Sequence, residues 1–423
     1  MKEVLFGSPY EAHPDWPAFQ DRLAAEAVSV GYTNTYEIRK RLAGARVWPH
    51  HVKSVADLGA IPVLAKDDLP DLQAARPPFG GLLSYRAGTL RRIYRSPGPI
   101  NDPQGDREDF WRVAPAASAA GFGAGDIVLN SFSYHLTPGG LMLDAGLRKL
   151  GCTVIPGGVG NSAAQVEIAC AAGATGYTGT PQFLLTLLER AVEMERRLPF
   201  RRALVTGAPL PPELRARLEY EFRVDVYQSY GTADAGTLGY ECPEKNGWHV
   251  APEIVIELLV PGDDRPAADG EVGQVVVTSP NEIYPLVRFG TGDLSAWNRE
   301  PCRCGRTSHR LAGFLGRVGE GVKVKGMFVH PRELAGALGD DPAVARYQAV
   351  VTEGAGGVDV FTVRVEAAPG CELGDGEVAA LGARIREAVK VRPVVEVVGA
   401  GEIAPDAGVV VDGRGLGRRR DVK

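Results

Sequence analysis

This sequence lacks the features that mark several special classes of protein. No apolar run in its 423 residues is long enough to cross a bilayer, so no membrane-spanning helix is expected. Its start, MKEVLFGSPYEAHPDW, has no apolar signal-peptide core, and we therefore expect a cytoplasmic protein. Six cysteines are too few for a disulfide scaffold in a chain of this length.

The chain also has little excess charge. Lysines and arginines number 47 and acidic residues 52, a formal net charge of −5, which gives no reason to expect nucleic acid or an anionic membrane as a partner. Hydrophobic residues at 44% and charged residues at 23% are typical of a globular protein. The length allows two or three domains, and a homodimer is the default expectation for its assembly.

The order of predicted elements indicates an α/β fold. Residues 14–28 and 66–75 have the apolar spacing of helices, and strands alternate with helices from about residue 90 to 230. This rhythm predicts a parallel sheet with right-handed crossovers. The predicted strands are residues 126–130, 152–156, 176–178 and 203–206, and the helices that follow them are residues 139–150, 163–171, 181–196 and 211–222.

The loops that follow parallel strands meet at one edge of a sheet, where such folds bind ligands. One of them, residues 227–242, reads YQSYGTADAGTLGYEC and follows an apolar alternating strand. Its small residues would let a backbone approach a phosphate or an aromatic ring closely, and a plain surface turn is the alternative. The loops that together predict a binding cleft are residues 96–99, 135–140, 178–181, 207–210 and 227–242.

The pattern changes after residue 250. Strands at 253–260 and 273–279, separated by a Pro-Gly-Asp-Asp turn, predict a β-rich section. A Gly- and Lys-rich segment at 316–326 has the composition of a hinge, and the rest of the chain alternates strands and helices as a small α+β unit. We therefore expect two domains, residues 1–318 and 319–423.

Seven short segments carry most of the specific information in the chain. They are TGTP at 178–181, GAPL at 207–210, SYGTAD at 229–234, YEC at 240–242, RFGTGD at 288–293, CRCGR at 302–306 and GRVGEGVKVKGMFVHPRE at 316–333. Their order and spacing resemble the adenylate-forming superfamily, most closely its phenylacetate–CoA ligase branch. The resemblance implies a large N-terminal domain of parallel sheets flanked by helices, with a β-rich subdomain, and a small, mobile α+β C-terminal lid.

The resemblance also implies an activity. Members of the family activate a carboxylic acid with ATP to an acyl-adenylate, release pyrophosphate, and pass the acyl group to a thiol, usually coenzyme A. For this chain the expected substrate is an aromatic or other small acid. One alternative is transfer to an amine or a carrier protein, and another is a nucleotide-binding homologue without turnover.

The nucleotide contacts follow from the same resemblance. Asp293 would accept hydrogen bonds from the ribose hydroxyls of AMP, a task that suits a carboxylate, and Tyr230 would stack on the adenine. The other expected contacts are Gly207, Ala208 and Pro209 around the adenine, Ser96, Gly231, Thr232 and Arg317 toward the ribose and phosphates, and Lys325 with Gly326 toward the thiol or its pantetheine.

Four residues are assigned to chemistry, three of them in the N-terminal domain and the fourth, Arg414, near the C-terminus. Asp234 falls where the family usually has a Glu that holds Mg²⁺, and Asp keeps the hard oxygen ligand with a shorter reach. Thr232 would lie near the α-phosphate. His135 lies in a loop that would wall the acid pocket, where it could act on an aryl hydroxyl or carboxylate; a packing or helix-capping histidine is the alternative.

A second group of residues has metal-ligand chemistry. Cys242 and His249 are spaced C-x6-H, and Cys302 and Cys304 form a later C-x-C. Three thiolates and one imidazole would complete a tetrahedral, structural Zn²⁺ site, with His309 as a substitute ligand. Because free buried cysteines are common, the alternative is that these thiols bind no metal.

Two segments depart from the family pattern. The phosphate loop, usually rich in Ser, Thr and Gly, is replaced by residues 94–101, where prolines remove amide donors, the hydroxyls are reduced to Ser96, and Arg95 could supply positive charge. The family's C-terminal lysine is missing. Arg414 is its nearest counterpart, with Lys423 as the alternative, and Arg keeps the charge without the geometry of Lys.

Overall fold

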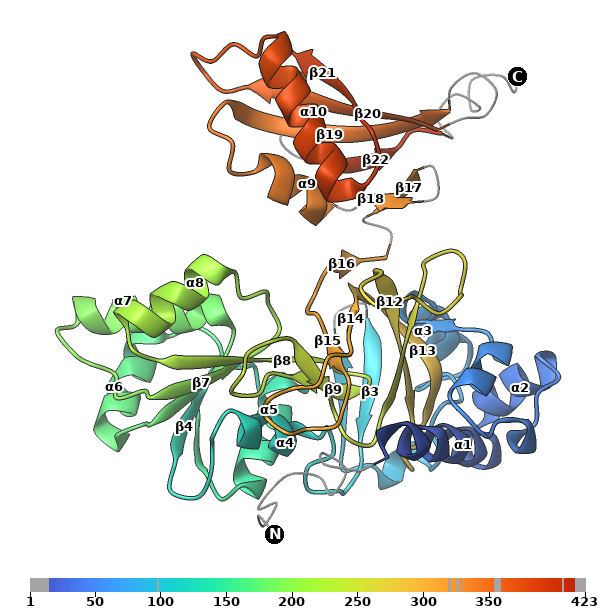
Figure 1. Cartoon of the computed structure of the whole chain (residues 1–423). Coiled ribbons are helices and arrows are strands. Elements are labelled where there is room, and N and C mark those ends of the chain that lie inside the picture. Colours follow the sequence, from blue (N-terminus) through green and yellow to red (C-terminus); the bar gives the residue numbers. More distant parts are fainter. Residues whose placement is uncertain are drawn as a thin grey trace. The chain divides into compact units, whose positions relative to one another are not determined.

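The computed structural model describes residues 15–96, 99–318, 321–324, 327–329, 331–353, 359–404 and 407–414. The chain forms two compact units, Met1–Phe314 and Leu315–Lys423, which Figure 1 draws and which are described separately. Within these described ranges, no helix is both long and apolar enough to cross a membrane.

The N-terminal unit begins with helices. In α1 (Trp16–Asn34) the carboxylate of Asp15 accepts a hydrogen bond from the backbone N–H of Ala18, so the helix has a capped start. α1 continues past the predicted end at residue 28, and its Gln20 amide donates to the carbonyl oxygen of Ile254. The elements that follow are α2 (Tyr36–Gly44), η1 (Pro49–His51), η2 (Ala56–Ala60), β1 (Leu64–Ala65), η3 (Lys66–Asp68), α3 (Leu69–Ala75) and η4 (Ala87–Thr89).

A nine-stranded sheet is the largest sheet of this unit, and half of it is parallel. Its parallel strands lie in the order β5-β4-β6-β7-β8, which confirms the predicted α/β fold class. They are β4 (Ile127–Asn130), β5 (Thr153–Pro156), β6 (Gly176–Gly179), β7 (Arg202–Val205) and β8 (Asp225–Thr232). The helices are α4 (Val113–Ala119), α5 (Gly139–Lys149), α6 (Ser162–Ala172), α7 (Pro181–Glu193), α8 (Pro212–Ala216) and the π-helical turn η5 (Arg217–Glu221).

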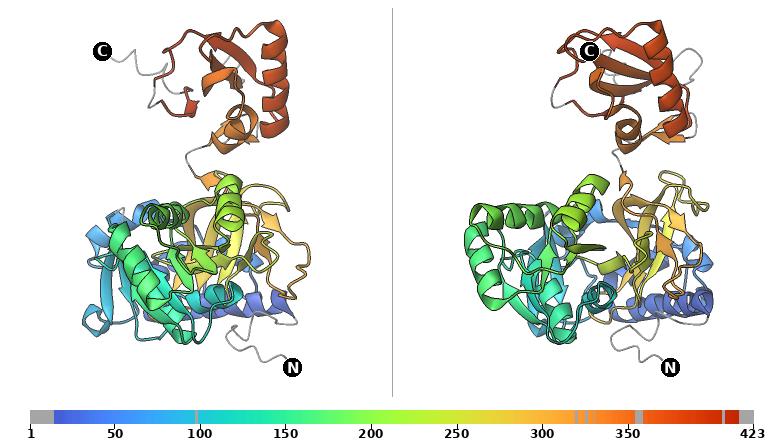
Figure 2. Two further views of the ribbon diagram at one scale, coloured as in Figure 1. Left: turned by 90° about the vertical axis from the view of Figure 1, so that its left-hand side faces the viewer. Right: turned by 60° about the vertical axis from the view of Figure 1, so that its left-hand side comes forward.

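The other half of the sheet is antiparallel and continues from β8 through β9 (Gly236–Tyr240), β10 (Trp248–Val250), β15 (Arg310–Leu311) and β14 (Trp297–Asn298). β8 therefore has a parallel neighbour on one side and an antiparallel neighbour on the other. The right-hand view of Figure 2 shows the green α/β half on the left of this unit and its yellow and blue part on the right.

A second sheet of the unit contains β1, β13 (Leu286–Ser295), β12 (Gly273–Ser279) and β11 (Val255–Leu259) in that order. β1 is parallel to β13, whereas the other two pairings are antiparallel. A separate hairpin joins β2 (Arg92–Ser96) and β3 (Ile100–Gln104) and corresponds to the segment that replaces the family's phosphate loop.

The C-terminal unit is an α+β unit. Its four-stranded sheet has the order β21-β20-β19-β22, and α9 and α10 contribute buried leucines and an isoleucine to its core. The strands are β19 (Val344–Glu353), β20 (Asp359–Ala367), β21 (Val394–Val398) and β22 (Val410–Asp412), with α9 (Pro331–Leu338), α10 (Asp375–Val389), β16 (Gly316–Arg317), and a hairpin of β17 (Val322–Val324) and β18 (Met327–Val329).

Candidate active site and metal centre

The segment 227–242, predicted to be a loop, forms most of a β-hairpin. β8 continues to Thr232, and β9 returns from Gly236 with an irregular register between Tyr230 and Gly231. The two strands approach so closely that a Cβ atom on Gly231 would lie 2.6 Å from the carbonyl oxygen of Gly236. The prediction of a loop was wrong here because small residues serve close strand packing as well as turns.

Tyr230 joins this hairpin to the second sheet. Its hydroxyl donates to Oδ2 of Asp293 on β13 at 2.9 Å, and its ring stacks on Trp248 of β10 with 5.2 Å between the centroids. Asp293 is 6% exposed, and its backbone N–H donates to the hydroxyl of Thr291 at 3.1 Å. The structure therefore brings together two residues that were predicted to bind the nucleotide, Tyr230 and Asp293.

Asp234 lies in the turn between β8 and β9 and is placed differently from expectation. Its side chain has no exposed surface, and its Oδ2 forms an ion pair of 2.6 Å with Nζ of Lys66 in η3. A Mg²⁺ ion at this carboxylate would have to displace an ammonium group that already balances its charge. The arrangement does not fit the predicted magnesium ligand, and we correct that assignment.

Ser96, predicted to contact phosphate, also faces inward. The residue is 8% exposed and lies against Asp102 of β3, which is 1% exposed. Burial, and then the nearby charge of Asp234, raises the pKa of Asp102 to about 8. Burial together with these two carboxylates also raises the pKa of Tyr284 well above its usual value. Sequence reasoning singled out Asp234 but missed its neighbours Lys66, Asp102 and Tyr284, which no motif marks.

The remaining predicted residues of the cleft lie at the ends of strands or in the loops that follow them. His135 is exposed, and the carbonyl oxygen of the next residue, Leu136, accepts a hydrogen bond from the backbone N–H of Arg95 in the β2–β3 hairpin. Thr232 accepts a hydrogen bond from the Ala235 backbone N–H and so closes the turn after β8. Gly207, Ala208 and Pro209 follow β7; Gly207 has a φ of 75°, and the oxygen of Pro209 accepts from the amide of Gln182.

The four predicted metal ligands lie together. Their ligand atoms are all within 4.8 Å of one another, with 3.7 Å between the sulfurs of Cys242 and Cys302 and 3.3 Å between Sγ of Cys304 and Nε2 of His249. Two thiolates on one tetrahedral zinc, with bonds of about 2.3 Å, are about 3.8 Å apart, so the set fits this ion. His309 lies outside the group, with its Nδ1 3.3 Å from a guanidinium nitrogen of Arg299.

The environment of the ligands also suits a metal. The Nδ1 atom of His249 lies 3.1 Å from the hydroxyl of Ser308, which orients the ring so that Nε2 faces the thiols. Burial lowers the pKa of His249 to about 4, which keeps the imidazole neutral, the form that binds metals. Burial raises the pKa of the Cys242 thiol to about 12, so a thiolate there needs a nearby cation.

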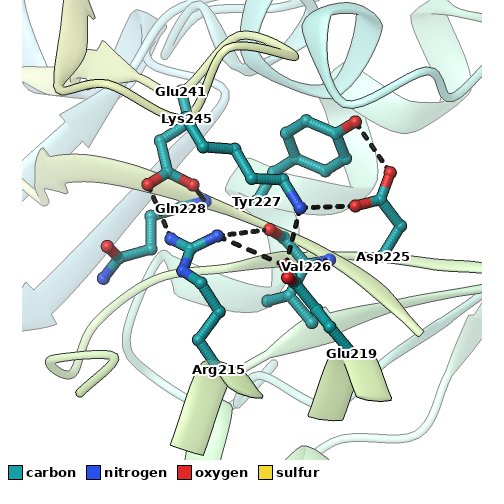
Figure 3. A network of polar contacts seen from close by, with 8 residues as sticks. All are labelled: Arg215, Glu219, Asp225, Val226, Tyr227, Gln228, Glu241 and Lys245. Atoms are coloured by element: carbon teal, nitrogen blue, oxygen red, sulfur yellow. Dashed lines mark hydrogen bonds and ion pairs between the residues drawn. The ribbon is translucent and has the colours of Figure 1, made fainter. Parts of the chain in front are cut away.

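A network of ion pairs connects this metal centre to β8 (Figure 3). Lys245, which follows Cys242 in the same loop, binds the carboxylates of Glu219 and Asp225. Glu241, next to Cys242, binds Arg215 at 2.6 Å and accepts a hydrogen bond from the Gln228 backbone N–H. Glu241 and Lys245, which lie on either side of Cys242 in the chain, are thereby attached to the start of β8 or to the helices before it.

The predicted residues of the C-terminal unit are less completely described. The guanidinium of Arg414 donates two hydrogen bonds to Asp412 and forms an ion pair of 3.0 Å with Asp359, so it is already engaged within its own unit. Arg317 is exposed in β16. Lys325 and Gly326, the predicted thiol contacts, lie outside the described residues, as does Lys423.

Similarity to known proteins decides the family. Residues 111–283 match the AMP-binding enzyme family. A phenylacetate–coenzyme A ligase from Aromatoleum evansii is 30% identical over 396 residues, which cover 87% of each chain. This chain belongs to the phenylacetate–CoA ligase family. The enzyme of that name from Thermus thermophilus is 29% identical over 82% of this chain and 81% of its own length.

The fold agrees with this family membership. A crystal structure of an open conformation of 2-hydroxyisobutyryl-CoA ligase, in complex with 2-HIB-AMP and CoA, has a TM-score of 0.85 at 23% identity and covers 92% of this chain and 90% of its own. At that identity the likeness concerns the fold alone. It confirms the predicted adenylate-forming architecture.

Proposed function

We propose that this protein activates a small carboxylic acid with ATP and transfers the acyl group to coenzyme A. In the first step a carboxylate oxygen attacks the α-phosphorus of ATP, and pyrophosphate leaves. In the second step the sulfur of CoA attacks the acyl carbon, and AMP leaves. The hydrogen bond between Tyr230 and Asp293 carries the proposal, because it places a buried carboxylate beside an aromatic ring where two sheets meet.

Asp293 is the residue to which we assign nucleotide recognition. Tyr230 and Thr291 hold its carboxylate and backbone in one orientation, so a ribose would meet a preformed acceptor. Trp248 stacks on Tyr230 and limits the movement of its ring. The loop of Gly207, Ala208 and Pro209 follows β7, the parallel neighbour of β8, and would border the adenine.

An aromatic acid is the substrate class that we infer. The family relatives are named for phenylacetate, and the loop at residues 135–140 and the hairpin from residue 227 are candidate walls for such an acid. CoA is the inferred acceptor for the same reason. Capture of the adenylate by an amine or a carrier protein is the alternative, and a homodimer stays a prediction.

Of the two proposed metals, zinc fits the residues and magnesium does not fit Asp234. Cys242, His249, Cys302 and Cys304 would hold Zn²⁺ as a closed structural site, which would fix the β9–β10 loop to the loop before β15. We assign no protein ligand to magnesium, which would enter as part of the Mg·ATP substrate.

The C-terminal unit is proposed to act as the mobile lid, with its start near residue 319. Arg414 would supply positive charge to the reacting phosphate in place of the family's lysine. To do so, it would have to give up its bonds to Asp412 and Asp359. We therefore expect slower adenylation than a lysine in this position would give.

Pyrophosphate release measures the proposed first step. Purified protein is incubated with Mg·ATP and a panel of acids that includes phenylacetate, with and without CoA. We expect acid-dependent release and an acyl-CoA product. Asp293→Asn should lower kcat/KM for ATP by about 100-fold, which corresponds to the loss of about 3 kcal/mol of hydrogen bonding to a charged group, whereas Asp106→Asn, an exposed control, should not change it.

The outcomes separate the alternatives. No pyrophosphate with any acid, from a protein that still binds ATP, would favour the homologue without turnover. Release without acyl-CoA, followed by amide formation when an amine is added, would favour transfer to an amine.

A further inference from the structure

We propose that Asp102 and Asp234 share one proton inside the protein, and that this acid pair, with Lys66 as its counter-ion, fixes the position of the β2–β3 hairpin. Asp102 would be a positioning residue that acts through the hairpin. The proposal concerns residues to which the proposed function assigns no chemistry.

Three separate segments supply the pair and its counter-ion. Asp102 lies on β3, where it pairs with Tyr94 of β2. Asp234 lies in the turn after β8, and Lys66 follows β1 directly. The hairpin is also attached to α3, because the Gln73 side chain donates to the Asn101 carbonyl oxygen at 2.9 Å and accepts from its N–H at 2.8 Å. Asp102 would thus add a second attachment, toward the β8–β9 turn.

The charges in this cluster do not balance if both acids are ionised. The Asp234 side chain has no exposed surface, Asp102 is 1% exposed, and Lys66 is a cation that pairs with Asp234 and lies near enough to Asp102 to act on its charge. Two carboxylates and one ammonium would leave one uncompensated negative charge away from water, which is costly. One proton on the pair removes that charge.

The hydrogen-bond donors and acceptors around the two carboxylates also indicate one proton on the pair. Among the described residues, both carboxylate oxygens of Asp102 and Oδ1 of Asp234 have no hydrogen-bond donor. Ionised carboxylates are acceptors only, so two of them cannot satisfy each other, whereas a protonated Asp102 has an O–H to donate to Asp234. The other polar groups that face the pair are the uncharged hydroxyls of Ser96 and Tyr284, for which the described part of the chain likewise offers no well-aligned partner. Ser96 lowers the pKa of Asp102, but its effect ranks behind those of burial and of Asp234, which raise it.

The raised pKa of Asp102, about 8 with burial as its main cause and Asp234 second, agrees with this arrangement. In the unfolded chain an aspartate has a pKa of about 3.9. Between these values the folded state binds one proton more than the unfolded state, so the contribution of Asp102 to stability decreases as the pH rises. The folding equilibrium constant should change roughly tenfold per pH unit over this range and level off above about pH 8.

The position of the hairpin matters for the proposed cleft. The backbone N–H of Arg95 donates to the oxygen of Leu136, so the hairpin contacts the loop that carries His135. A second carboxylate charge at Asp102 would push against Asp234 and weaken the attachment of the hairpin on that side. The inference about the proton itself does not depend on the proposed reaction.

Infrared spectroscopy and urea unfolding of the full chain test the proton. At pH 6.5 the wild-type spectrum minus that of Asp102→Asn should show the C=O stretching band of one carboxylic acid, and the difference should disappear above about pH 9. Relative to Asp102→Asn, which supplies an N–H donor without titrating, the wild type should lose stability as the pH rises from 5 to 8. The exposed control Asp71→Asn should leave the wild-type pH dependence unchanged.

Asp102→Leu separates the donor from the charge. Its stability should lack the Asp102 contribution to pH dependence and lie below that of Asp102→Asn at every pH, because Oδ1 of Asp234 then has no donor. Absence of the acid band with parallel pH curves for the wild type and Asp102→Asn would overturn the proposal. It would also be overturned if Mg²⁺ or Ca²⁺ stabilised the wild type but not Asp102→Asn, since a cation would then hold the pair. Because neither assay involves ATP, this result is independent of the pyrophosphate assay.

Discussion

Two buried polar clusters lie at opposite ends of the β9 strand, and they differ in the source of their positive charge. At its end, Cys242 joins His249, Cys302 and Cys304 in a set that suits a metal ion from solution. At its start, Asp234 pairs with Lys66 of the same chain and lies beside Asp102. The comparison shows that buried negative charge can be balanced by a bound ion or by groups of the chain itself. The two clusters should respond to acid in opposite ways, because protons compete with a metal for thiolates but neutralise a pair of carboxylates.

The largest expected effect is at the metal centre. Cys242→Ser should reduce bound zinc from about one equivalent to below half and lower the free energy of unfolding by several kcal/mol, since structural zinc can contribute on the order of 10 kcal/mol. Metal analysis and urea unfolding check this, with the isolated surface cysteine replaced in Cys371→Ser as the control. Equal stability of the wild type with and without a chelator would show that the thiols need no ion.

A smaller loss is expected at the acid cluster. Lys66→Met removes the counter-ion of Asp234 and should destabilise the protein by about 3–5 kcal/mol at pH 8, because a buried charge is left without its partner. The loss should shrink at pH 5.5, where protons can replace the ammonium. Urea unfolding at both pH values measures it beside Lys53→Met, an exposed lysine. A loss that is the same at both pH values would contradict a cluster neutralised by protons.

Tyr230 lies on β8, the strand that precedes both clusters, and its replacement tests whether the proposed nucleotide site depends on how the Asp293 carboxylate is held. Tyr230→Phe keeps the ring and its stacking on Trp248 but removes the hydrogen bond to Asp293. We expect about a tenfold weaker affinity for AMP, as for the loss of about 1.4 kcal/mol, with little change in zinc content. Calorimetric titration with AMP measures the effect, and unchanged affinity would remove Tyr230 from the nucleotide site.

The smallest effect is expected in the network around the metal loop. Lys245→Met breaks the pairs with Glu219 and Asp225, but these groups are partly exposed, so the stability should fall by about 1 kcal/mol or less. Zinc content should stay at one equivalent. Loss of zinc from this variant would mean that the network, rather than the four ligands, holds the loop in place.

The two clusters also differ in how far the sequence could predict them. Thiols and an imidazole at short spacings are distinctive ligands, so the metal set was visible before the fold was known. Asp102 and Lys66 have no comparable signal, because an aspartate in a strand and a lysine before a helix are common surface residues. Their proximity depends on β1, β3 and the β8–β9 turn meeting in space.

The amino-acid sequence by itself determined the alternation of strands and helices, the β-rich section and the group of motifs that marks the family. Helix and strand periodicity and motif spacing are local properties of a sequence. Tertiary structure decided what the segment 227–242 does. Its glycines allow close strand packing, its Asp234 is turned inward to Lys66, and its Tyr230 is set on Asp293 from another sheet. These outcomes depend on burial and on partners far away in the chain, which no local pattern records.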